Sequence, residues 1–478
     1  MPSILSANTL SSGFDVGNSV RFNRADSAIL NKTFDDDGTH HDKGTISLWI
    51  KRNELGAEEV LFSAGANNRE FIRFESNDTL TYRSVAESYH LNTNRVFRDV
   101  SAWYHIVVAF DSSQGTASNR NKIYVNGVQE TSFATETYTP NQNMDHKLLS
   151  GELNSLGKDS EQNTFAACYF CEVVGIDGVA HDPTSFGEFD EDSGIWKPKS
   201  VSGLTFGTNG FHLNFADSSA LGTDVSGNGN NFANTNLAAT DQSTDTCTNN
   251  ACTWNTLYRN SATFTQGNLV YQAPGSNPVF GSITTFGVSA GKWYAECKYH
   301  AGSSHYGIIG ICDEVFATLG DLGSATNTDF GKTGAALGSH PNTCTVAYVI
   351  NTGKIRNNNN NQNYGSGGGD GDIINIALDR DNRKVYFGIN GTYENSGDPA
   401  AGSNGFDISG QVTGDTYFLG VTNDTGASET ILDFNFGGGF GQTAVSSANA
   451  DANGHGNFEY AVPSGFFAWN TKNLAENG

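Results

Sequence analysis

Acidic residues at alternate positions mark one segment that could do chemistry. Glu188, Asp190 and Asp192 are each separated by one residue, and alternate residues of a strand point to the same side. Two carboxylates held about 5 to 9 Å apart can hydrolyse a glycosidic bond. The surrounding segment, GEFDEDSG, is typical of a turn, so the alternative is a solvated acidic loop. We favour the loop.

Other catalytic patterns are not evident. We identify no nucleophile elbow of the Gly-x-Ser-x-Gly type, and the eleven histidines show no His-Glu-x-x-His spacing. His40-His41, beside an acidic loop, could bind a metal, but adjacent loop histidines are more often solvated. We therefore expect a protein that is not an enzyme.

Hard oxygen ligands, as Ca²⁺ requires, concentrate in two loop segments. These are Asp35-Asp36-Asp37-Gly38 and Asp370-Gly371-Asp372. Asx turns are the alternative explanation for such segments. We expect no cofactor other than Ca²⁺, for which the weak candidate ligands are Asp35, Asp37, Asp370 and Asp372.

A ligand site on a β-sandwich commonly uses aromatic rings that stack on sugar faces, with polar neighbours that bind hydroxyl groups. Tryptophans in strand patterns are expected in the core, which leaves aromatic residues in polar loops. The candidates for such a site are Tyr89, His90, Tyr138 and Tyr364.

The positions that carry these candidates belong to a long acidic chain. It has 478 residues and a formal net charge of −24, with 37% hydrophobic and 16% charged residues. A packed core is therefore expected beneath a mostly uncharged polar surface. The charge argues against nucleic acid as a partner. No run of eighteen apolar residues and no secretory signal is visible, so we expect no membrane insertion.

The seven cysteines are too few for a disulfide scaffold of this size. Cys168 and Cys171 form an isolated C-x-x-C, with a minor chance of a metal or redox role. Cys247 and Cys252 lie in a polar segment and could pair, which the sequence does not decide.

Short segments of alternating β-branched and aromatic residues recur between Gly, Asn, Asp and Ser clusters, a pattern typical of an all-β sandwich. Asn126-Gly127 and Asn390-Gly391 each follow such a segment and predict tight hairpins. A weak internal echo joins residues 107–124 to 375–386. The predicted strands are 44–52, 71–75, 79–83, 103–110, 122–125, 168–174, 292–298, 306–312, 345–350, 373–379, 384–389, 417–421 and 430–436.

Residues 216–259 are too polar to order themselves independently. They predict a linker, or a strap lying across a neighbour. The fold class is therefore two jelly-roll sandwiches in tandem joined by a polar strap. The expected divisions are an N-terminal arm (1–14), a first sandwich (15–215), the strap (216–259) and a second sandwich (260–478).

The first half resembles the laminin-G-like, concanavalin A-like lectin/glucanase superfamily, through residues 44–52 (GTISLWIKR), 103–108 (WYHIVV) and 122–127 (KIYVNG). The resemblance implies a concanavalin A-like jelly roll, often with Ca²⁺ at its rim. Its glucanases share the pattern Glu-x-Asp-x-x-Glu. Here Glu188 begins a similar segment, but Ser193 stands where the last Glu belongs, which argues against catalysis.

The second half resembles a SPRY domain, which is itself a concanavalin A-like sandwich that recognises proteins or peptides with loops at one end. Residues 357–364 would then form a recognition loop. The segments that carry this resemblance are 291–296 (GKWYAE), 306–311 (YGIIGI), 371–374 (GDII), 379–391 and 432–437 (LDFNFG).

The order of both sandwiches and the segments between them is similar to structural proteins of tailed bacteriophages. The intervening segments are 186–190 (FGEFD), 195–198 (IWKP), 208–211 (TNGF) and 224–230 (DVSGNGN). The resemblance implies a virion protein, made in the host cytoplasm and released by lysis. Phage fibres are commonly trimeric, although no coiled-coil heptad is present to enforce a homotrimer.

We therefore expect a tail fibre or spike component that binds a host surface glycan or receptor and contacts other virion proteins. A capsid-decoration or assembly protein that contacts only virion proteins is the alternative. A polysaccharide depolymerase is disfavoured by the incomplete carboxylate pattern.

Overall fold

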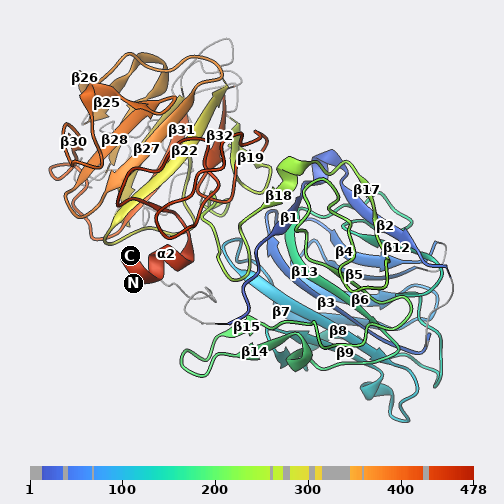
Figure 1. Ribbon diagram of the computed structural model, residues 1–478. Helices are drawn as coiled ribbons and strands as arrows, with labels where there is room; N and C mark the ends of the chain where they lie inside the picture. Colours follow the sequence, from blue (N-terminus) through green and yellow to red (C-terminus); the bar gives the residue numbers. More distant parts are fainter. Residues whose placement is uncertain are drawn as a thin grey trace. The chain divides into compact units, whose positions relative to one another are not determined.

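The chain forms two compact units that divide between Asn250 and Ala251. The computed structural model describes residues 13–35, 41–66, 69–258, 262–272, 280–300, 307–314, 345–357, 360–423 and 430–478. Each unit is a sandwich of antiparallel sheets (Figure 1), called here the first and the second sandwich. Among the described residues, no helix is long and apolar enough to cross a membrane.

The first sandwich consists of two eight-stranded sheets, A and B. Sheet A has the order β10 (Val128–Gln129), β9 (Asn121–Val125), β8 (Trp103–Asp111), β3 (Lys43–Arg52), β13 (Cys168–Asp177), β1 (Ser19–Phe22) and β18 (Gln242–Ser243), and β16 (Phe211–Leu213) pairs with β13. Sheet B has the order β11 (Phe133–Thr137), β7 (His90–Val96), β6 (Thr79–Ser84), β5 (Glu70–Phe74), β4 (Glu59–Ala64), β12 (Leu153–Leu156), β2 (Ile29–Thr33) and β17 (Ala233–Thr235).

The second sandwich consists of sheets C and D. Sheet C has the order β19 (Thr263–Thr265), β20 (Val270–Gln272), β32 (Ile431–Asn435), β22 (Lys292–His300), β27 (Ile373–Asp379), β28 (Lys384–Ile389) and β29 (Thr392–Tyr393), with β30 (Phe406–Asp407) on β28 and β33 (Phe467–Ala468) on β22. Sheet D has the order β21 (Phe280–Ile283), β31 (Tyr417–Asn423), β23 (Gly307–Asp313), β24 (Thr345–Val349), β25 (Lys354–Asn357) and β26 (Asn360–Asn363). Helix α2 (Thr471–Asn477) follows, with Asn470 as its N-cap.

Each sandwich buries its own hydrophobic core between its two sheets. Alternation along the strands supplies it, because every second side chain faces the partner sheet. In the first core Leu48, Ile72 and Phe170 are fully buried. In the second, Ile309 and Ile376 are equally inaccessible.

The two predicted Asn-Gly hairpins are present and use the same hydrogen bonds. Asn126 and Asn390 have φ values of 47° and 50°, and each is followed by a glycine with positive φ. The Asn126 side chain accepts from the His105 amide at 2.8 Å. That of Asn390 accepts from the Ile373 amide at 2.9 Å. The echo between the halves therefore corresponds to the equivalent hairpins β8–β9 and β27–β28.

The segment predicted as a linker or strap, 216–259, is divided between the two units. Up to Asn250 it lies along the first sandwich, where β17 pairs with β2 and β18 with β1. The buried Lys51 amine binds both Asp245, at 2.8 Å, and Asn250, at 2.7 Å. Trp254 already belongs to the second core. The polar segment is ordered because its carboxylate and amide groups find partners on sheet A.

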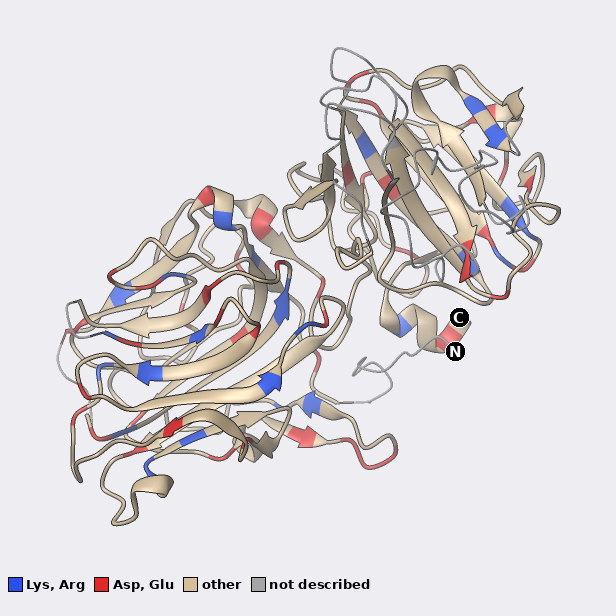
Figure 2. Cartoon of the chain, turned by 180° about the vertical axis from the view of Figure 1, so that it is seen from behind, with Lys and Arg blue, Asp and Glu red and all other residues tan. Residues whose placement is uncertain are grey.

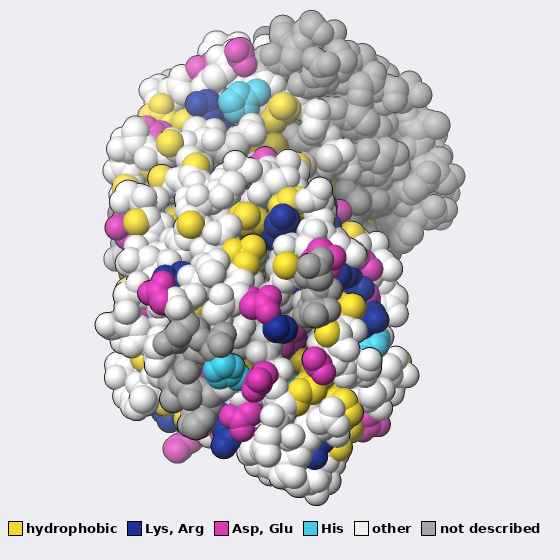
Figure 3. All heavy atoms as spheres, turned by 90° about the vertical axis from the view of Figure 1, so that its right-hand side faces the viewer, with side chains coloured by type: hydrophobic (Ala, Val, Ile, Leu, Met, Phe, Trp, Pro, Cys, Tyr) yellow, Lys and Arg dark blue, Asp and Glu magenta, His cyan; other side chains and the backbone are white. Residues whose placement is uncertain are grey.

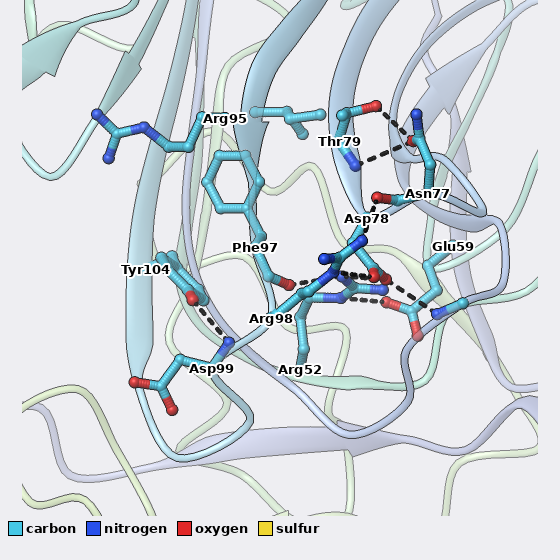
Figure 4. A network of polar contacts seen from close by, with 12 residues as sticks. Arg52, Glu59, Asn77, Asp78, Thr79, Arg95, Phe97, Arg98, Asp99 and Tyr104 are labelled. Carbon is cyan, nitrogen blue, oxygen red and sulfur yellow. Dashed lines mark hydrogen bonds and ion pairs between the residues drawn. The ribbon is translucent and has the colours of Figure 1, made fainter. Parts of the chain in front are cut away.

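A buried ion-pair network fastens one end of the first sandwich (Figure 4). The fully buried Arg52 donates to Glu59, at 3.1 Å, and to Asp78, also at 3.1 Å. It also donates to the Phe97 carbonyl at 2.7 Å. Burial raises the pKa of Glu59 to about 7, against the opposing effect of Arg52 and Arg24. Because the network joins strands of both sheets, it holds β3 of sheet A to β4 of sheet B.

Charged residues are interleaved along the strands and loops (Figure 2). On the face shown in Figure 3, Lys and Arg side chains are scattered among acidic and uncharged ones and form no continuous basic patch.

Candidate functional site

The outer face of sheet A is interrupted at β13 by a β-bulge. The pairing of β13 with β3 shifts register between Cys171 and Val174. Glu172 lies within this shift and has a φ of 46°. A non-glycine residue in this left-handed region costs about 1 kcal/mol, and such bulges redirect side chains. Val173 remains in the core between the sheets, whereas Glu172 lies in the wall of an outer pocket.

His212 faces Glu172 from the neighbouring strand β16. Its neighbours Phe211 and Leu213 are buried in the core, so alternation directs His212 outward. Its Nε2 lies 2.8 Å from Glu172 Oε2, and the two side chains are 12% and 9% exposed. Because an ionised carboxylate only accepts, we assign the proton to Nε2.

Two further contacts position His212, one at its imidazole and one at its backbone amide. The Phe206 ring lies parallel to it, with 6.4 Å between ring centroids. The His212 amide donates to Asp224 Oδ1 at 2.9 Å. Asp224 also accepts from Ser226 and Asn230, so the 224–230 turn holds β16 in place.

The pocket bounded by this pair has a volume of about 370 Å³; we call it the Glu172 pocket. No Lys or Arg is found among the described residues that line it. Glu172 Oε1 accepts no hydrogen bond within the described part of the chain, although the side chain is nine-tenths buried. The wall therefore combines hydrogen-bond acceptors with aromatic and apolar surface. Its other lining residues are Phe14, Asp15, Gly17, Asn18, Ser200, Val201, Ser202, Phe206, Asn214, Ala216, Val225 and Ser226.

A second pocket, of about 300 Å³, lies beside β8 and β9 and includes Lys122, Tyr124 and His181. Its carboxylates are engaged by their own turns: Asp111 accepts from Ser113, and Asp182 from Thr184. It therefore offers a ligand fewer open acceptors than the Glu172 pocket.

Two of the predicted ligand residues, Tyr89 and Tyr364, are buried, so the expectation of accessible rings is wrong. Tyr89 is 1% exposed, and its hydroxyl lies 3.1 Å from His146 Nδ1. Tyr364 is 6% exposed, and its hydroxyl accepts the Phe387 amide at 3.3 Å. Burial raises the pKa of Tyr364 to about 12. Both rings fill core space although their sequence neighbours are polar.

His90 and Tyr138 are half-buried and remain accessible, but they do not form one site. Thr137, not Tyr138, pairs with His90, so Tyr138 points to the opposite side of sheet B. The Tyr138 hydroxyl donates to Glu136 at 2.6 Å. Burial lowers the pKa of His90, and nearby Arg83 adds to the effect. None of the four predicted ligand residues lines the Glu172 pocket.

The predicted calcium ligands gain no support. Within the described ranges, no three His, Cys, Asp or Glu side chains are grouped to hold a metal ion. Asp35 and Asp370 are exposed, and Asp37 lies outside the described residues. Asp372 accepts from the Gly369 amide and the Asn390 side chain, both at 2.7 Å, which is turn chemistry.

The acidic triplet lies in the exposed hairpin of β14 (Gly187–Phe189) and β15 (Trp196–Pro198). Lys197 contacts both Glu188, at 3.5 Å, and Asp190, at 3.2 Å. Hydrogen bonds from Ser193 and from Lys197 lower the pKa of Asp190 to about 2. A carboxyl with that pKa is ionised and does not serve as a general acid near neutral pH. Asp192 is exposed, so the arrangement matches the solvated-loop interpretation.

The expectation that Gly-x-Ser-x-Gly is absent is wrong, because Gly287-Val288-Ser289-Ala290-Gly291 fits that spacing. It precedes strand β22 rather than a helix, unlike a nucleophile elbow. Within the described part of the chain, no histidine is hydrogen-bonded to Ser289.

The described cysteines are buried, and none of them forms a disulfide. Cys168 points into the core between sheets A and B, whereas Cys171 lies in an outer cluster with Cys247. The C-x-x-C therefore does not bring its two thiols together. Cys252 belongs to the second core, so Cys247 and Cys252 lie in different units.

Glu172 and His212 were not among the predicted site residues. Glu172 is the single charged residue of the predicted strand 168–174 (CYFCEVV). A charge in an otherwise apolar strand is the signal that could have found it. His212 gives no comparable signal, because its role depends on the pairing of β16 with β13.

Residues 23–173 match the family model of the concanavalin A-like lectin/glucanases superfamily. That range covers most of the first sandwich and includes Glu172. No curated protein matches the chain.

Several solved structures are similar to the chain. A candidate carbohydrate binding protein from Bacteroides ovatus ATCC 8483 is 14% identical, with a TM-score of 0.33 over 47% of this chain. The chain spans 59% of that protein's length. The SPRY domain of human HERC1 is 13% identical, with a TM-score of 0.26, covering 37% of this chain and 91% of the domain. The TRIM65 PSpry domain is 12% identical, with a TM-score of 0.26, covering 38% and 90%.

These TM-scores lie below 0.5, so the likenesses carry no argument about function. The predicted fold class, all-β with two sandwiches in tandem, is confirmed by the sheets, and the family match supports the concanavalin A-like assignment of the first sandwich.

Proposed function

We propose that the first sandwich binds carbohydrate without cleaving it, and that the Glu172 pocket holds the sugar. The observation that carries the proposal is the open Oε1 of a nine-tenths buried glutamate, in a pocket that also contains Asn18, Asn214 and Phe206. Sugar hydroxyls donate to carboxylate and amide oxygens, and their apolar faces pack on aromatic rings. The lectin-superfamily match over residues 23–173 supports this assignment.

Binding without catalysis is favoured by the partners of the carboxylates. Glu188 and Asp190, the pair nearest to the glucanase pattern, are held by Lys197 in an exposed hairpin. Glycoside hydrolysis needs one carboxyl that stays protonated opposite one that is ionised, and the low pKa of Asp190 does not suit the first role.

The test is a binding experiment with the purified chain, an oligosaccharide panel and intact host cells, in which released reducing ends are recorded from the same samples. We expect binding without cleavage, and at least a tenfold loss of affinity in Phe206→Ala. Cleavage that disappears in Glu188→Gln would overturn the non-enzymatic assignment. Absence of binding across the panel would overturn the proposed function.

We further propose that this binding serves a tailed-bacteriophage virion, in which the chain is a tail fibre or spike component displayed to a host glycan. The support is the order of motifs between the two sandwiches described above. Cryo-EM of the particle tests the assignment, and we expect density at the tail. Density on the head would instead favour capsid decoration.

A further inference from the structure

We propose that the ligand of the Glu172 pocket carries a positively charged amino group, as in a hexosamine that is not acetylated. This inference rests on the proposed carbohydrate function and narrows the class of sugar. Its basis is a difference in charge: Glu172 and the other buried carboxylates of the same sandwich have different partners.

Buried carboxylates elsewhere in the first sandwich are compensated within the chain. Some meet a cation: Glu59 and Asp78 pair with Arg52, Asp245 with Lys51, Asp159 with Arg69 and Asp241 with Arg21. Asp224 is instead satisfied by the amides of His212, Ser226 and Asn230 and the Ser226 hydroxyl. Such compensation is expected, because burying an unpaired charge is costly.

Glu172 departs from this pattern. Among described residues its side chain has a single hydrogen-bond partner, the imidazole of His212, which fills Oε2 and leaves Oε1 open. None of the described lining residues is Lys or Arg, and Asp15 adds a second carboxylate at an exposed edge of the pocket. When the His212 imidazole is neutral and Nε2 donates to Glu172, Nδ1 remains an acceptor and the carboxylate keeps its full charge. Apart from Ser and Asn side chains, which both donate and accept, the pocket therefore offers a ligand carboxylate acceptors with their negative charge.

An ammonium group supplies the positive charge that the lining residues of the pocket lack. It brings three N–H donors and one positive charge, and a charge-assisted hydrogen bond to a carboxylate is roughly twice as strong as a neutral one. The Phe14 and Phe206 rings in the same wall can also attract a cation at their faces. An anionic sugar would be repelled by the Glu172 carboxylate, and none of the described lining residues is a Lys or Arg that could attract it.

Glucosamine and N-acetylglucosamine form a matched pair of probes that differ at this amino group. We would titrate the full chain with each at pH 7.0, where an amine of this kind is mostly protonated and an ordinary imidazole is mostly neutral. The inference predicts at least tenfold tighter binding of glucosamine, weakening as salt is raised. In Glu172→Gln the preference should fall below twofold, while Asp15→Asn should reduce it less. Thermal unfolding of Glu172→Gln confirms that the variant is folded.

Glu188→Gln is the matched control, because Glu188 is a carboxylate of the same sandwich that lies outside the pocket. The Glu188→Gln variant should prefer glucosamine as strongly as the unaltered chain does. Equal binding of both sugars would overturn the inference while leaving the proposed function standing. A preference that persists in Glu172→Gln would place the ammonium elsewhere and also overturn it. If neither sugar nor any member of the panel binds, the proposed function and the inference both fail.

Discussion

Glu172 in β13 and Glu296 in β22 are both buried glutamates on the outer face of a strand, yet their surroundings differ. Glu172 has one side-chain partner and opens on a pocket. Glu296 is 0% exposed and accepts three hydrogen bonds: from the amides of Glu459 and Tyr460, at 2.9 and 2.8 Å, and from the Tyr294 hydroxyl at 2.9 Å.

The difference arises from what covers each sheet. In the second sandwich, Phe458 and Phe466 of the C-terminal segment pack on Tyr294 of sheet C. The Glu459 and Tyr460 amides of that segment donate to the Glu296 carboxylate. In the first sandwich, the covering segments leave a pocket over β13 instead. A buried glutamate on the outer face of a strand can thus hold a neighbouring segment of the chain, as Glu296 does, or bind a ligand, as we propose for Glu172.

The largest expected effect is a loss of stability when Glu296 is removed. Glu296→Ala leaves two amides and one hydroxyl without their partner, and each such buried group costs about 1 to 3 kcal/mol. We expect the free energy of unfolding of the second sandwich to fall by about 3 kcal/mol. Hydrogen exchange at the Glu459 and Tyr460 amides should accelerate. Glu476→Ala, an exposed control in helix α2, should change stability by less than about 0.5 kcal/mol; protected amides in Glu296→Ala would contradict the role.

The pH dependence of the second sandwich tests the same contact. Burial raises the pKa of Glu296 to about 7 from 4.5. The folded state then binds a proton that the unfolded state has lost, so the contribution of Glu296 to stability is greatest below pH 4.5 and declines as pH rises to about 7. The contribution of this one group is about 3 kcal/mol. Chemical unfolding of the second sandwich between pH 4.5 and 8 should show a shallower decline in Glu296→Gln. Equal slopes would exclude Glu296 as the source.

A smaller effect, on binding rather than stability, is expected at the other glutamate. Glu172→Gln keeps the size of the side chain but removes its charge, so affinity for the preferred sugar should fall at least tenfold, or about 1.4 kcal/mol. The melting temperature should remain within a few degrees. A large loss of stability with unchanged affinity would mean that Glu172 fastens the fold as Glu296 does.

The smallest effect is expected in the acidic hairpin. Glu188→Gln should leave both sugar binding and reducing-end release unchanged, because Glu188 lies outside the Glu172 pocket and is half exposed. Calorimetry and a reducing-end assay on the same samples measure both quantities. Weaker sugar binding in the variant, or reducing-end release that the unaltered chain shows and the variant does not, would mean that this hairpin belongs to the functional site.

Much of the fold could be predicted from local patterns. Predicted strands 103–110 and 373–379 correspond to β8 and β27, because period-two alternation and Asn-Gly turns act over short distances. The division at Asn250 falls within the junction predicted at 216–259, but its position there was not predicted, because polar residues such as Asp245 are ordered by partners distant in sequence, here Lys51. Local composition carries no information about such pairing.

The candidate site was less accessible to prediction. Tyr89 and Tyr364 have polar neighbours in sequence but are needed to fill the cores, so composition around a tyrosine did not report its burial. Glu172 depends on a bulge, and His212 on the pairing of β16 with β13. These features arise from register between distant segments, which a single sequence does not reveal.

The most direct test of the account is an experimental structure of the chain bound to the tightest ligand of the oligosaccharide panel. We expect the sugar in the Glu172 pocket, with a donor group within hydrogen-bond distance of Glu172 Oε1 and a ring face on Phe206, while Glu296 keeps its contacts to Glu459 and Tyr460. A sugar bound to the second sandwich, or to the first sandwich away from Glu172, would contradict the account.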